Sequence, residues 1–457
     1  MAKSKKKDSK AIPRLESLKQ LKLNAAGIDI GAAEIWVCVP EDRDEQPVRR
    51  FGTFTSDLYN IAAWLKNCGV DTVAMESTGI YWIPLYEILE ENGLDVNLVN
   101  PRYVKHVPGR KSDILDCQWL QQLHSYGLLS PSFRPEKETR KLRDLSRHRD
   151  NLIRYRAAHI QHMQKALRLM NLQLANVISD ITGKTGMRII RAIVSGQRRP
   201  EVLATYRDPN CKNDQKTIEK SLQGNYAEEY VFQLKQALEL YDYYTEKIKE
   251  CEREIEKQFT RIPGRVDPKV KPLGPSTKTN SHCKNEPDFD LRSQLYRMCG
   301  VDLTAVDGLN AVTVHNVVTE TGVDMNKWPT VKHFASWLSL SPYNDISGGK
   351  ILRTKTKKTK SRANKALRQA AQSLSRSNSY LGAYYRRMHA RLGPAKAITA
   401  TAHKLARIIY VMLKEQIDYV DLGPDYYLTK NRQREVKKLL KKASALGFYI
   451  TPIPSVS

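Results

Sequence analysis

The sequence lacks a long apolar run. Hydrophobic residues make up 41% of its 457 residues. No uninterrupted apolar stretch approaches the roughly 20 residues that a membrane-spanning helix needs. The first residues, Met1–Lys7, carry several lysines and lack the apolar core of a signal peptide. We therefore expect a protein without membrane segments that works in the cytoplasm.

Cysteine is scarce, and its spacing does not fit a metal site or a disulfide framework. The seven cysteines are odd in number and scattered, and no two of them form the close pair that is typical of a zinc site. Cys38, Cys68 and Cys117 fall in apolar or helical segments. The pattern excludes a small disulfide-stapled secreted domain and predicts reduced thiols.

Acidic residues are too few to balance the basic ones. The chain has 75 Lys and Arg against 49 Asp and Glu, a net charge of +26 and a sequence pI of about 9.6. This excess predicts a polyanionic partner and binding that weakens with salt. A ribosomal or membrane-surface protein can carry the same charge. Residues 1–23 form a basic tail that either touches nucleic acid or is simply solvated.

The pattern around which the chain is organised lies in residues 25–39 (AAGIDIGAAEIWVCV). Its alternating apolar residues predict two short strands joined by a tight turn. Asp29 interrupts the first strand with a carboxylate, which is costly to bury without a cation or a donor beside it. A strand-end acid that accepts hydrogen bonds from turn amides is the alternative. The strands and helices that follow predict an α/β domain with a mixed sheet over residues 24–130.

Three further acids stand where they can join Asp29. Glu76 ends a second apolar strand, and Asp113 and Asp116 are three residues apart on one face of a helix. Carboxylates from two strand ends and one helix can converge on one or two divalent cations, and Mg²⁺ suits carboxylate and phosphate oxygens. Two such ions can clamp the attacking and leaving oxygens of a phosphoryl transfer. Alternatively, Asp113 is only a favourable charge at a helix N-terminus.

In this order and on these elements, the four acids resemble those of the DEDD transposases of insertion sequences. The similarity extends through residues 76–82 (ESTGIYW), 99–101 (VNP) and 109–116 (GRKSDILD). It resumes at residues 340–350 (LSPYNDISGGK). The N-terminal domain of that family is similar to the Holliday-junction nuclease RuvC and has a ribonuclease H fold. The family includes the RNA-guided bridge recombinases.

The resemblance implies a cofactor, substrates and partners. It implies Mg²⁺ held by the catalytic acids Asp29, Glu76, Asp113 and Asp116. It also implies donor and target DNA as substrates, a structured non-coding bridge RNA as guide, and a homo-oligomer, expected to be a tetramer, that shares its site between protomers. Such an enzyme would work at the nucleoid in the bacterial cytoplasm.

Two heptad patterns predict a coiled-coil helical domain over residues 135–260. The first helix is expected at 136–178 and the second from about 226 to 260, with a less regular segment, 179–225, between them. They are expected to form either an antiparallel hairpin or a dimerising coiled coil. The residues that recur every seven positions are Ile153, Ile160, Leu167 and Leu174 in the first helix and Leu234, Tyr241, Ile248 and Ile255 in the second.

The first of these helices is dense in cations. Its basic face can hold RNA phosphates, although a solvated helix surface is nearly as good an interpretation. These cations are Arg140, Lys141, Arg143, Arg147, Arg149, Arg154 and Arg156.

The rest of the chain divides into a linker, a helical domain and a tail. Residues 261–290 combine prolines and glycines with polar residues, which is typical of a mobile linker. Residues 291–420 are expected to form a mainly helical C-terminal domain, with helices at 331–340, 361–381 and 395–417. Residues 421–457 form a basic tail with a helix around 432–442.

The sequence Ser347-Gly348-Gly349-Lys350 is a second candidate chemical centre. Its glycines let the backbone approach a phosphate closely, but a serine hydroxyl is a poor nucleophile unless it is activated. In isolation such a sequence is usually only a loop. Its position matches the family motif whose serine attacks the DNA backbone. The resemblance therefore implies Ser347 as the nucleophile of a phosphoserine–DNA intermediate, with Ser339 and Ser341 as alternatives.

Residues 350–368 contain no acid and are the strongest basic run in the chain. Such a run predicts nucleic-acid binding. The family usually shows a glycine in this region, where this chain has Ala363. The predicted nucleic-acid-binding residues are Lys350, Arg353, Lys355, Lys357, Lys358, Lys360, Arg362, Lys365 and Arg368.

The expected fold is therefore α/β plus α: a RuvC-like, ribonuclease H-like mixed-sheet domain, long coiled-coil helices and a mainly helical C-terminal domain. The leading hypothesis is a DNA transposase, or recombinase, of a mobile insertion sequence. The alternative is a hydrolytic, RuvC-like, structure-specific DNA nuclease that uses only the four acids. A nucleic-acid-binding protein without catalysis is the third hypothesis.

Overall fold

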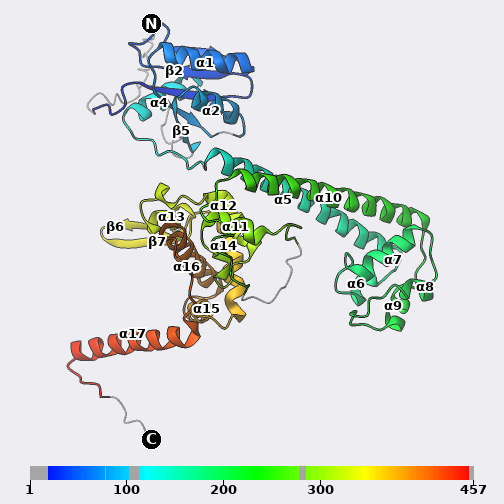
Figure 1. Ribbon diagram of the computed structural model, residues 1–457. Helices are drawn as coiled ribbons and strands as arrows, with labels where there is room; N and C mark the ends of the chain where they lie inside the picture. The colour runs from blue at the N-terminus through cyan, green and yellow to red at the C-terminus, as the bar shows by residue number, and fades with distance from the viewer. Residues whose placement is uncertain (1–18, 78, 102–112, 277–284, 452–457) are drawn as a thin grey trace, which may run out of the picture. The chain divides into compact units, whose positions relative to one another are not determined.

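The computed structural model describes residues 19–77, 79–101, 113–276 and 285–451, and the chain divides into two compact units, residues 1–134 and 135–457 (Figure 1). Most of the predicted basic N-terminal tail lies outside the described residues. So does the GRKS part of the motif at 109–116.

A five-stranded mixed sheet forms the centre of the first unit. Its order is β3-β2-β1-β4-β5, with β1 antiparallel to β2 and parallel to β4. β2 and β3 are antiparallel, and β4 and β5 are parallel. This mixed α/β arrangement was predicted and is consistent with a RuvC-like fold. The strands are β1 (Ala25–Ile30), β2 (Ile35–Cys38), β3 (Val48–Phe51), β4 (Thr72–Glu76) and β5 (Asp95–Val99).

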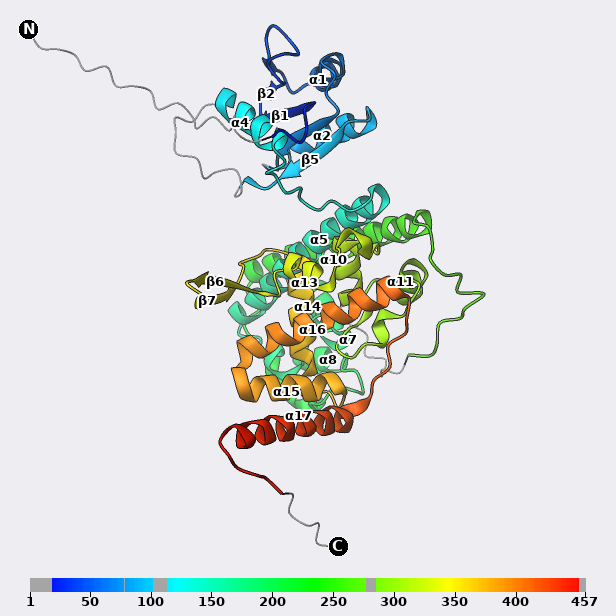
Figure 2. The ribbon, with the colours of Figure 1, turned by 90° about the vertical axis from the view of Figure 1, so that its left-hand side faces the viewer.

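Helices cover both faces of this sheet (Figure 2). On one face, α1 (Thr55–Asn67) and α2 (Trp82–Glu91) bury apolar side chains against Ile28 and Met75, which form one core with them. The opposite face carries α4 (Asp113–Ser125), which packs on β1 and β2. Because the residues of a strand alternate between faces, β1 directs Ile28 to the first helical layer and Gly27 and Asp29 to the second.

Two long helices pair side by side at the start of the second unit. They are α5 (Lys137–Leu169) and α10 (Glu228–Arg261), and they run antiparallel as a hairpin (Figure 1). An antiparallel hairpin was one of the two predicted arrangements. A buried ion pair joins them: Arg149 Nη2 lies 2.5 Å from Glu252 Oε1. The supercoil that the heptads predict stays a prediction.

The first long helix ends earlier than its heptad pattern predicts. It stops at Leu169, and Asn171 adopts a left-handed φ of 57°. Leu174 therefore lies in a separate short helix, α6 (Leu174–Val177), and not on α5, where the heptad pattern had placed it. It is fully buried there, in the core that Leu167 and Leu234 also join.

The segment at 179–225 is more ordered than expected. It holds α7 (Lys184–Val194), α8 (Pro200–Ala204) and α9 (Gln215–Ser221). Their apolar residues, including the fully buried Ile190 and Leu203, form one core with the adjoining ends of α5 and α10. The irregular insert of the prediction is thus a small helical module at the end of the hairpin.

The rest of the second unit is mainly helical, as predicted. Inside it, Phe334, Leu367 and Leu405 are fully buried. The predicted helix at 361–381 is broken after Ser373, and the tail helix starts nine residues earlier than the predicted residue 432. The helices are α11 (Leu291–Cys299), α12 (Ala311–Thr321), α13 (Val331–Trp337), α14 (Arg362–Ser373), α15 (Tyr380–Leu392), α16 (Pro394–Glu415) and α17 (Gly423–Ala445).

Described parts of the predicted linker are held in place. Arg297 Nη1 donates a hydrogen bond of 2.9 Å to the Ile262 carbonyl, and Arg265 Nη1 donates one of 3.1 Å to the Leu413 carbonyl. At the far end, Arg149 Nη2 donates to the Asn285 carbonyl at 2.8 Å. The linker is therefore anchored at both ends of its described part.

No helix in the described ranges is long and apolar enough to cross a membrane.

Candidate active site

The register of two parallel strands makes Asp29 and Glu76 neighbours. Ile28 of β1 is paired with Met75 of β4, so the next residue on each strand lies beside the other. Both acids are partly exposed at the carboxyl ends of these strands. Because aligned residues of parallel neighbours face the same side, both carboxylates point to the face that α4 covers.

Gly27 lets α4 approach this face of the sheet. A Cβ atom on Gly27 would lie 2.3 Å from the Cys117 carbonyl oxygen and 2.3 Å from the Gln121 backbone nitrogen. These are backbone atoms that cannot rotate away, so the helix could not lie where it does against any other residue. The first turn of this close-packed helix carries Asp113 and Asp116.

Hydrogen bonds fix the other end of α4. Gln121 Nε2 donates to the Ala25 carbonyl at 3.3 Å, and the buried His124 Nε2 lies 2.9 Å from Thr72 Oγ1. Burial lowers the pKa of His124 to about 4, so this imidazole is neutral at physiological pH. The helix is thus tied to β1 and β4, the two strands that carry the other acids.

The four carboxylates act on one another electrostatically. Burial, followed by the negative charges of Asp116, Asp113 and Glu76, raises the pKa of Asp29 to about 6. Like charges held together disfavour ionisation, and a bound cation reverses this effect. The set consists of hard oxygen donors, which fit a divalent ion such as Mg²⁺.

In this structure the four carboxylates do not lie close enough together to bind one metal ion. In the described ranges, no three His, Cys, Asp or Glu side chains form a group that could hold a metal ion. The four carboxylates therefore have to draw closer to share one. Asp113 is exposed and the other three acids are partly exposed, which leaves them room to do so.

Ser347 lies at the tip of an exposed hairpin and not in an irregular loop. The hairpin consists of β6 (Pro342–Ser347) and β7 (Lys350–Thr356), in which Ser347 pairs with Lys350. Gly348 and Gly349 have φ values of 54° and 75°. Positive φ at both central residues is what a two-residue type I′ turn requires. The turn alone therefore explains why both positions are glycine, whether or not a phosphate binds there.

The Ser347 hydroxyl is exposed. Within the part of the chain that the structure describes, no hydrogen bond to this hydroxyl is formed. Among the alternative serines, Ser341 is partly exposed, and Ser339 adopts a left-handed φ of 57° after α13. A serine needs a base, a metal or a tuned environment to attack phosphorus, so the activating group has to be brought to the tip.

The predicted basic run follows β7 from this tip to the base of the hairpin and continues into α14. Every residue of β7 is exposed, and Lys357 Nζ lies 5.1 Å from the centroid of the Tyr343 ring on β6. Lys365 and Arg368 are exposed on α14. Arg362 differs, because it forms an ion pair with Asp150 of α5. Eight of the nine predicted cations therefore remain open to a polyanion, and Arg362 is already engaged.

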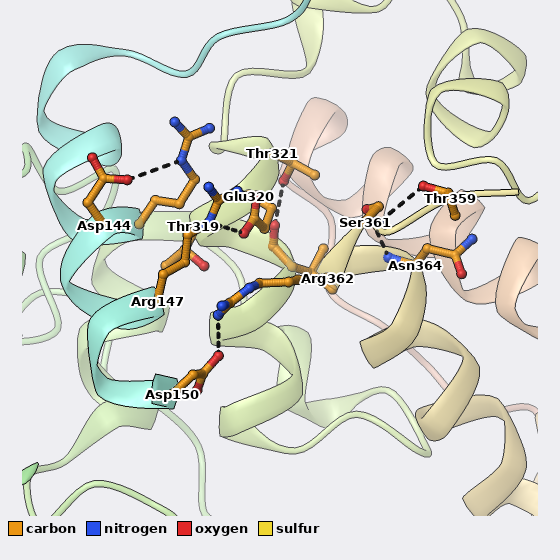
Figure 3. A network of polar contacts seen from close by, with 12 residues as sticks. Asp144, Arg147, Asp150, Thr319, Glu320, Thr321, Thr359, Ser361, Arg362 and Asn364 are labelled. Atoms are coloured by element: carbon orange, nitrogen blue, oxygen red, sulfur yellow. Dashed lines mark hydrogen bonds and ion pairs between the residues drawn. The ribbon is translucent and has the colours of Figure 1, made fainter. Parts of the chain in front are cut away.

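The first turn of α14 bonds to the chain on both sides of the hairpin, and Figure 3 shows the hydrogen bonds of Ser361 with Thr359 and Asn364. The buried Asn364 donates from Nδ2 to the Leu338 carbonyl at 2.7 Å, just before the hairpin begins. Ser361 caps the helix by accepting from the Asn364 backbone nitrogen at 3.3 Å, and its own backbone nitrogen donates to Thr359 Oγ1 at 3.1 Å. Ala363 is fully buried in this helical turn, where an alanine fits.

Ion pairs join this region to the long helices. Arg362 reaches Asp150, and Arg147 binds Glu320 of α12 through Nε at 2.9 Å and Nη2 at 2.7 Å (Figure 3). Arg149 is buried against Glu252. Arg147 and Arg149 of the predicted basic face thus hold helices together, and the prediction that this face of α5 can hold RNA phosphates stays a prediction for its other cations.

Two comparisons with transposase families decide which family this is. A DEDD transposase model of the IS110 type matches residues 26–172, and the model of the IS116/IS110/IS902 transposase family matches residues 302–386. Together they cover just over half of the chain. The chain belongs to the IS110 family of transposases. No curated protein matches it significantly.

The two matches coincide with the two candidate centres of this IS110-family transposase. The first spans all four acids, and the second spans the serine hairpin and the basic run. Membership implies an enzyme that cuts and rejoins DNA, and transposases of the DEDD type typically use a divalent metal. The resemblance seen in the sequence is confirmed.

Gly27, Asn364 and Asp150 are the residues of these two centres that the sequence did not single out. A glycine inside a strand is a known signal of close backbone approach, so Gly27 was open to recognition. Nothing around Asn364 or Asp150 distinguishes them in the sequence, because their partners lie 26 and 212 residues away.

We predict that Asp29→Asn stabilises the fold at pH 7.5 in a chelating buffer. Because the folded-state pKa of Asp29 is raised to about 6, the wild type loses stability as pH rises from about 4 to 6. After allowance for solvent screening, the gain is of the order of 1 kcal/mol. Thermal unfolding at pH 5 and pH 7.5 should show it mainly at the higher pH. Added Mg²⁺ should stabilise the wild type and not the variant.

The control for this measurement is Glu45→Gln, which changes an exposed acid of the same unit. It should leave stability unchanged at both pH values. If Asp29→Asn were less stable than the wild type in chelator at pH 7.5, the other acids would not disfavour the ionised form of Asp29.

We predict that Gly27→Ala lowers DNA cleavage by roughly a hundredfold without removing any carboxylate. Its methyl group meets the backbone of α4, so the helix and its two acids must shift, and small displacements of this kind have large catalytic effects. Such overpacking also costs about 1–3 kcal/mol of stability. The conservative Ile28→Val, which faces the opposite layer at a cost of about 1 kcal/mol, should keep its activity. Equal cleavage by Gly27→Ala and the wild type would contradict this account.

We predict that Asn364→Ala loosens the serine hairpin. It leaves the Leu338 carbonyl without its buried donor, at a cost of about 1–3 kcal/mol. Hydrogen exchange measured by mass spectrometry should become faster in peptides that cover residues 342–356. Asn326→Ala, an exposed asparagine of the same unit, should not change it. Unchanged exchange in Asn364→Ala would mean that the hairpin is held by other contacts.

Proposed function

We propose that this transposase cuts and rejoins DNA through a phosphoserine intermediate at Ser347. The observation that carries the proposal is the placement of Ser347 at the exposed tip of a hairpin that is surrounded by cations. Residues 350–368 include nine Lys or Arg and no acid. A DNA backbone drawn to these cations brings its phosphates to the serine hydroxyl.

The proposed chemistry consists of two transesterifications. The Ser347 Oγ attacks a DNA phosphorus and loses its proton, while the bond from phosphorus to the 3′ oxygen breaks and that oxygen leaves as a protonated 3′-hydroxyl. A 3′-hydroxyl of another strand then attacks the phosphoserine, and the serine hydroxyl is restored. One phosphoester bond replaces another in each step, so no external energy source is needed.

We further propose that Asp29, Glu76, Asp113 and Asp116 bind Mg²⁺. When bound, the ion supplies positive charge that polarises the phosphoryl oxygens. The chain supplies the parts around it: β1 and β4 fix two of the acids, and Gly27 sets how closely α4 brings the other two. Asp29 has to be ionised to take part, so its raised pKa favours activity above about pH 6.

The family resemblance supports two extensions of the proposal. A structured bridge RNA would guide the enzyme to donor and target DNA at the nucleoid, and the net charge of +26 suits two nucleic-acid partners. The enzyme would act as a homotetramer, and α5 and α10 would form a coiled coil within each protomer. Such an enzyme would be cytoplasmic and bacterial.

The alternative to the phosphoserine mechanism is hydrolysis of DNA that uses the four acids and not Ser347. It is favoured by the exposed Ser347 hydroxyl, for which no activating partner is present among the described residues. In that reaction water attacks the phosphorus, and no covalent protein–DNA species forms. Trapping distinguishes the two reactions.

We predict a protein–DNA adduct that survives denaturation and needs both centres. The protein is incubated with Mg²⁺, a duplex of its element-end DNA and the flanking transcript, then denatured and resolved by electrophoresis. Wild type should form the adduct, and Ser347→Ala should lose it entirely because the attacking oxygen is gone. Asp29→Asn should reduce it at least a hundredfold, since the acid set would be incomplete.

Ser336→Ala is the matched control, because it removes an exposed helical hydroxyl from the same part of the chain. It should form as much adduct as the wild type. An adduct that persists in Ser347→Ala would move the nucleophile to Ser341 or Ser339, each tested by the same substitution. Cleavage without an adduct, at equal rates in wild type and Ser347→Ala, would establish the hydrolytic nuclease instead.

A further inference from the structure

The last two long helices bring together cations that carboxylates do not neutralise. Lys404 and Arg407 lie one turn apart on α16, and Lys430 and Arg434 lie one turn apart on α17. Across the described ranges, none of these four side chains takes part in an ion pair. We name these four residues the α16–α17 cation cluster.

Lys404 shows that the cluster is more than a solvated surface. Its side chain is partly buried, and burial lowers its pKa, followed by the positive charges of Arg407, Lys430 and Arg434. A partly buried cation near three others costs free energy that a lysine extended into water would avoid. Pairs of like charges one helical turn apart add a few tenths of a kcal/mol to that cost. A bound polyanion would offset both.

Tyrosine rings hold two of these cations. Lys404 Nζ lies 5.6 Å from the centroid of the Tyr380 ring, and Lys430 Nζ lies 5.2 Å from that of the Tyr426 ring. The two ring centroids are 6.4 Å apart. Cations interleaved with aromatic rings are typical of surfaces that bind a nucleic-acid backbone and its bases.

The surroundings add a hollow and further charges. Lys404 and Arg407 border a cavity of about 250 Å³ between α16 and residues 417–420, whose lining also includes Asp418, an acid paired with Lys271 at 3.6 Å. The acid of α17 nearest along the chain, Glu435, is already engaged by Arg387 at 2.9 Å and Lys438 at 3.5 Å. α17 as a whole carries seven Lys or Arg and two Asp or Glu. α15 packs against both α16 and α17, as Figure 2 shows, and so joins the two cation-bearing helices.

We propose that the α16–α17 cation cluster is a second nucleic-acid-binding site, which takes the phosphodiester backbone of DNA or RNA. The cluster lies outside both family matches, which end at residues 172 and 386, and it shares no residue with the basic run at 350–368. It does not depend on the serine chemistry. Its role is to hold a segment of nucleic acid apart from the scissile phosphate.

The test is a salt titration of binding with two doubly neutralised variants, Lys404→Gln/Arg407→Gln and Lys430→Gln/Arg434→Gln. Fluorescence anisotropy is measured with a labelled duplex DNA of random sequence and with a labelled structured RNA. Each phosphate contact contributes about 0.9 to the slope of log affinity against log salt for duplex DNA. Each variant should therefore lose about 2 from the slope and bind about tenfold more weakly or worse.

The matched control is Lys216→Gln/Lys220→Gln, which removes the same charge from one turn of exposed helix in α9. The control should keep the wild-type slope. A larger loss on one probe than on the other identifies the nucleic acid that the cluster holds. Wild-type slopes in both variants on both probes, or an equal loss in the control, would overturn the proposal.

Two further measurements keep the outcome interpretable. Thermal unfolding without nucleic acid should show variants at least as stable as the wild type, because substitution removes repulsion and no ion pair. Ser347→Ala should bind both probes with the wild-type slope. A failure of the serine proposal would therefore appear in the adduct, and a failure of this proposal only in the binding slope.

Discussion

The close approach of α4 to β1 is the constraint on which the acidic site depends. Two acids belong to the sheet and follow from strand register, but the other two reach the same place only because a helix lies directly on Gly27. The distance is set by backbone against backbone, the least compressible contact that a protein offers. The metal site that we propose for these carboxylates would gain from such a fixed support.

The acidic site and the α16–α17 cation cluster both hold like charges together. Burial and neighbouring negative charges raise the pKa of Asp29 at the sheet edge, and burial and neighbouring positive charges lower that of Lys404 on α16. Neither arrangement favours the free fold, and each would be relieved by the ligand that we propose for it, a metal cation in one case and a phosphate chain in the other. By contrast, Arg147 and Arg149 of α5 are paired with Glu320 and Glu252 and serve the fold.

The parts of the fold that local patterns specify were predictable. The alternation in residues 25–39 gave β1 and β2, and the strand-end position of Glu76 follows from the apolar run before it. The end of α5 was not predictable in this way, since Leu174 continues the heptad. Leu174 shares a core with Leu167, so its apolar spacing is kept, and only the structure shows that the helix is interrupted at Asn171 between them. The role of Asn364 depends on its hydrogen bond to the Leu338 carbonyl, which the spacing of residues in the sequence does not reveal.

The exposure of the β6–β7 hairpin has a consequence for selectivity. A two-stranded ribbon with one fully exposed strand has little buried surface of its own, and such a ribbon is at best marginally stable alone. If Ser347 is the nucleophile that we propose, a substrate that lies along this ribbon also steadies the attacking oxygen. A phosphodiester that makes only passing contact would then meet a serine that is held less firmly. Chromosomal DNA outside the correct site would thereby be protected from cutting by the same exposure that leaves the serine accessible.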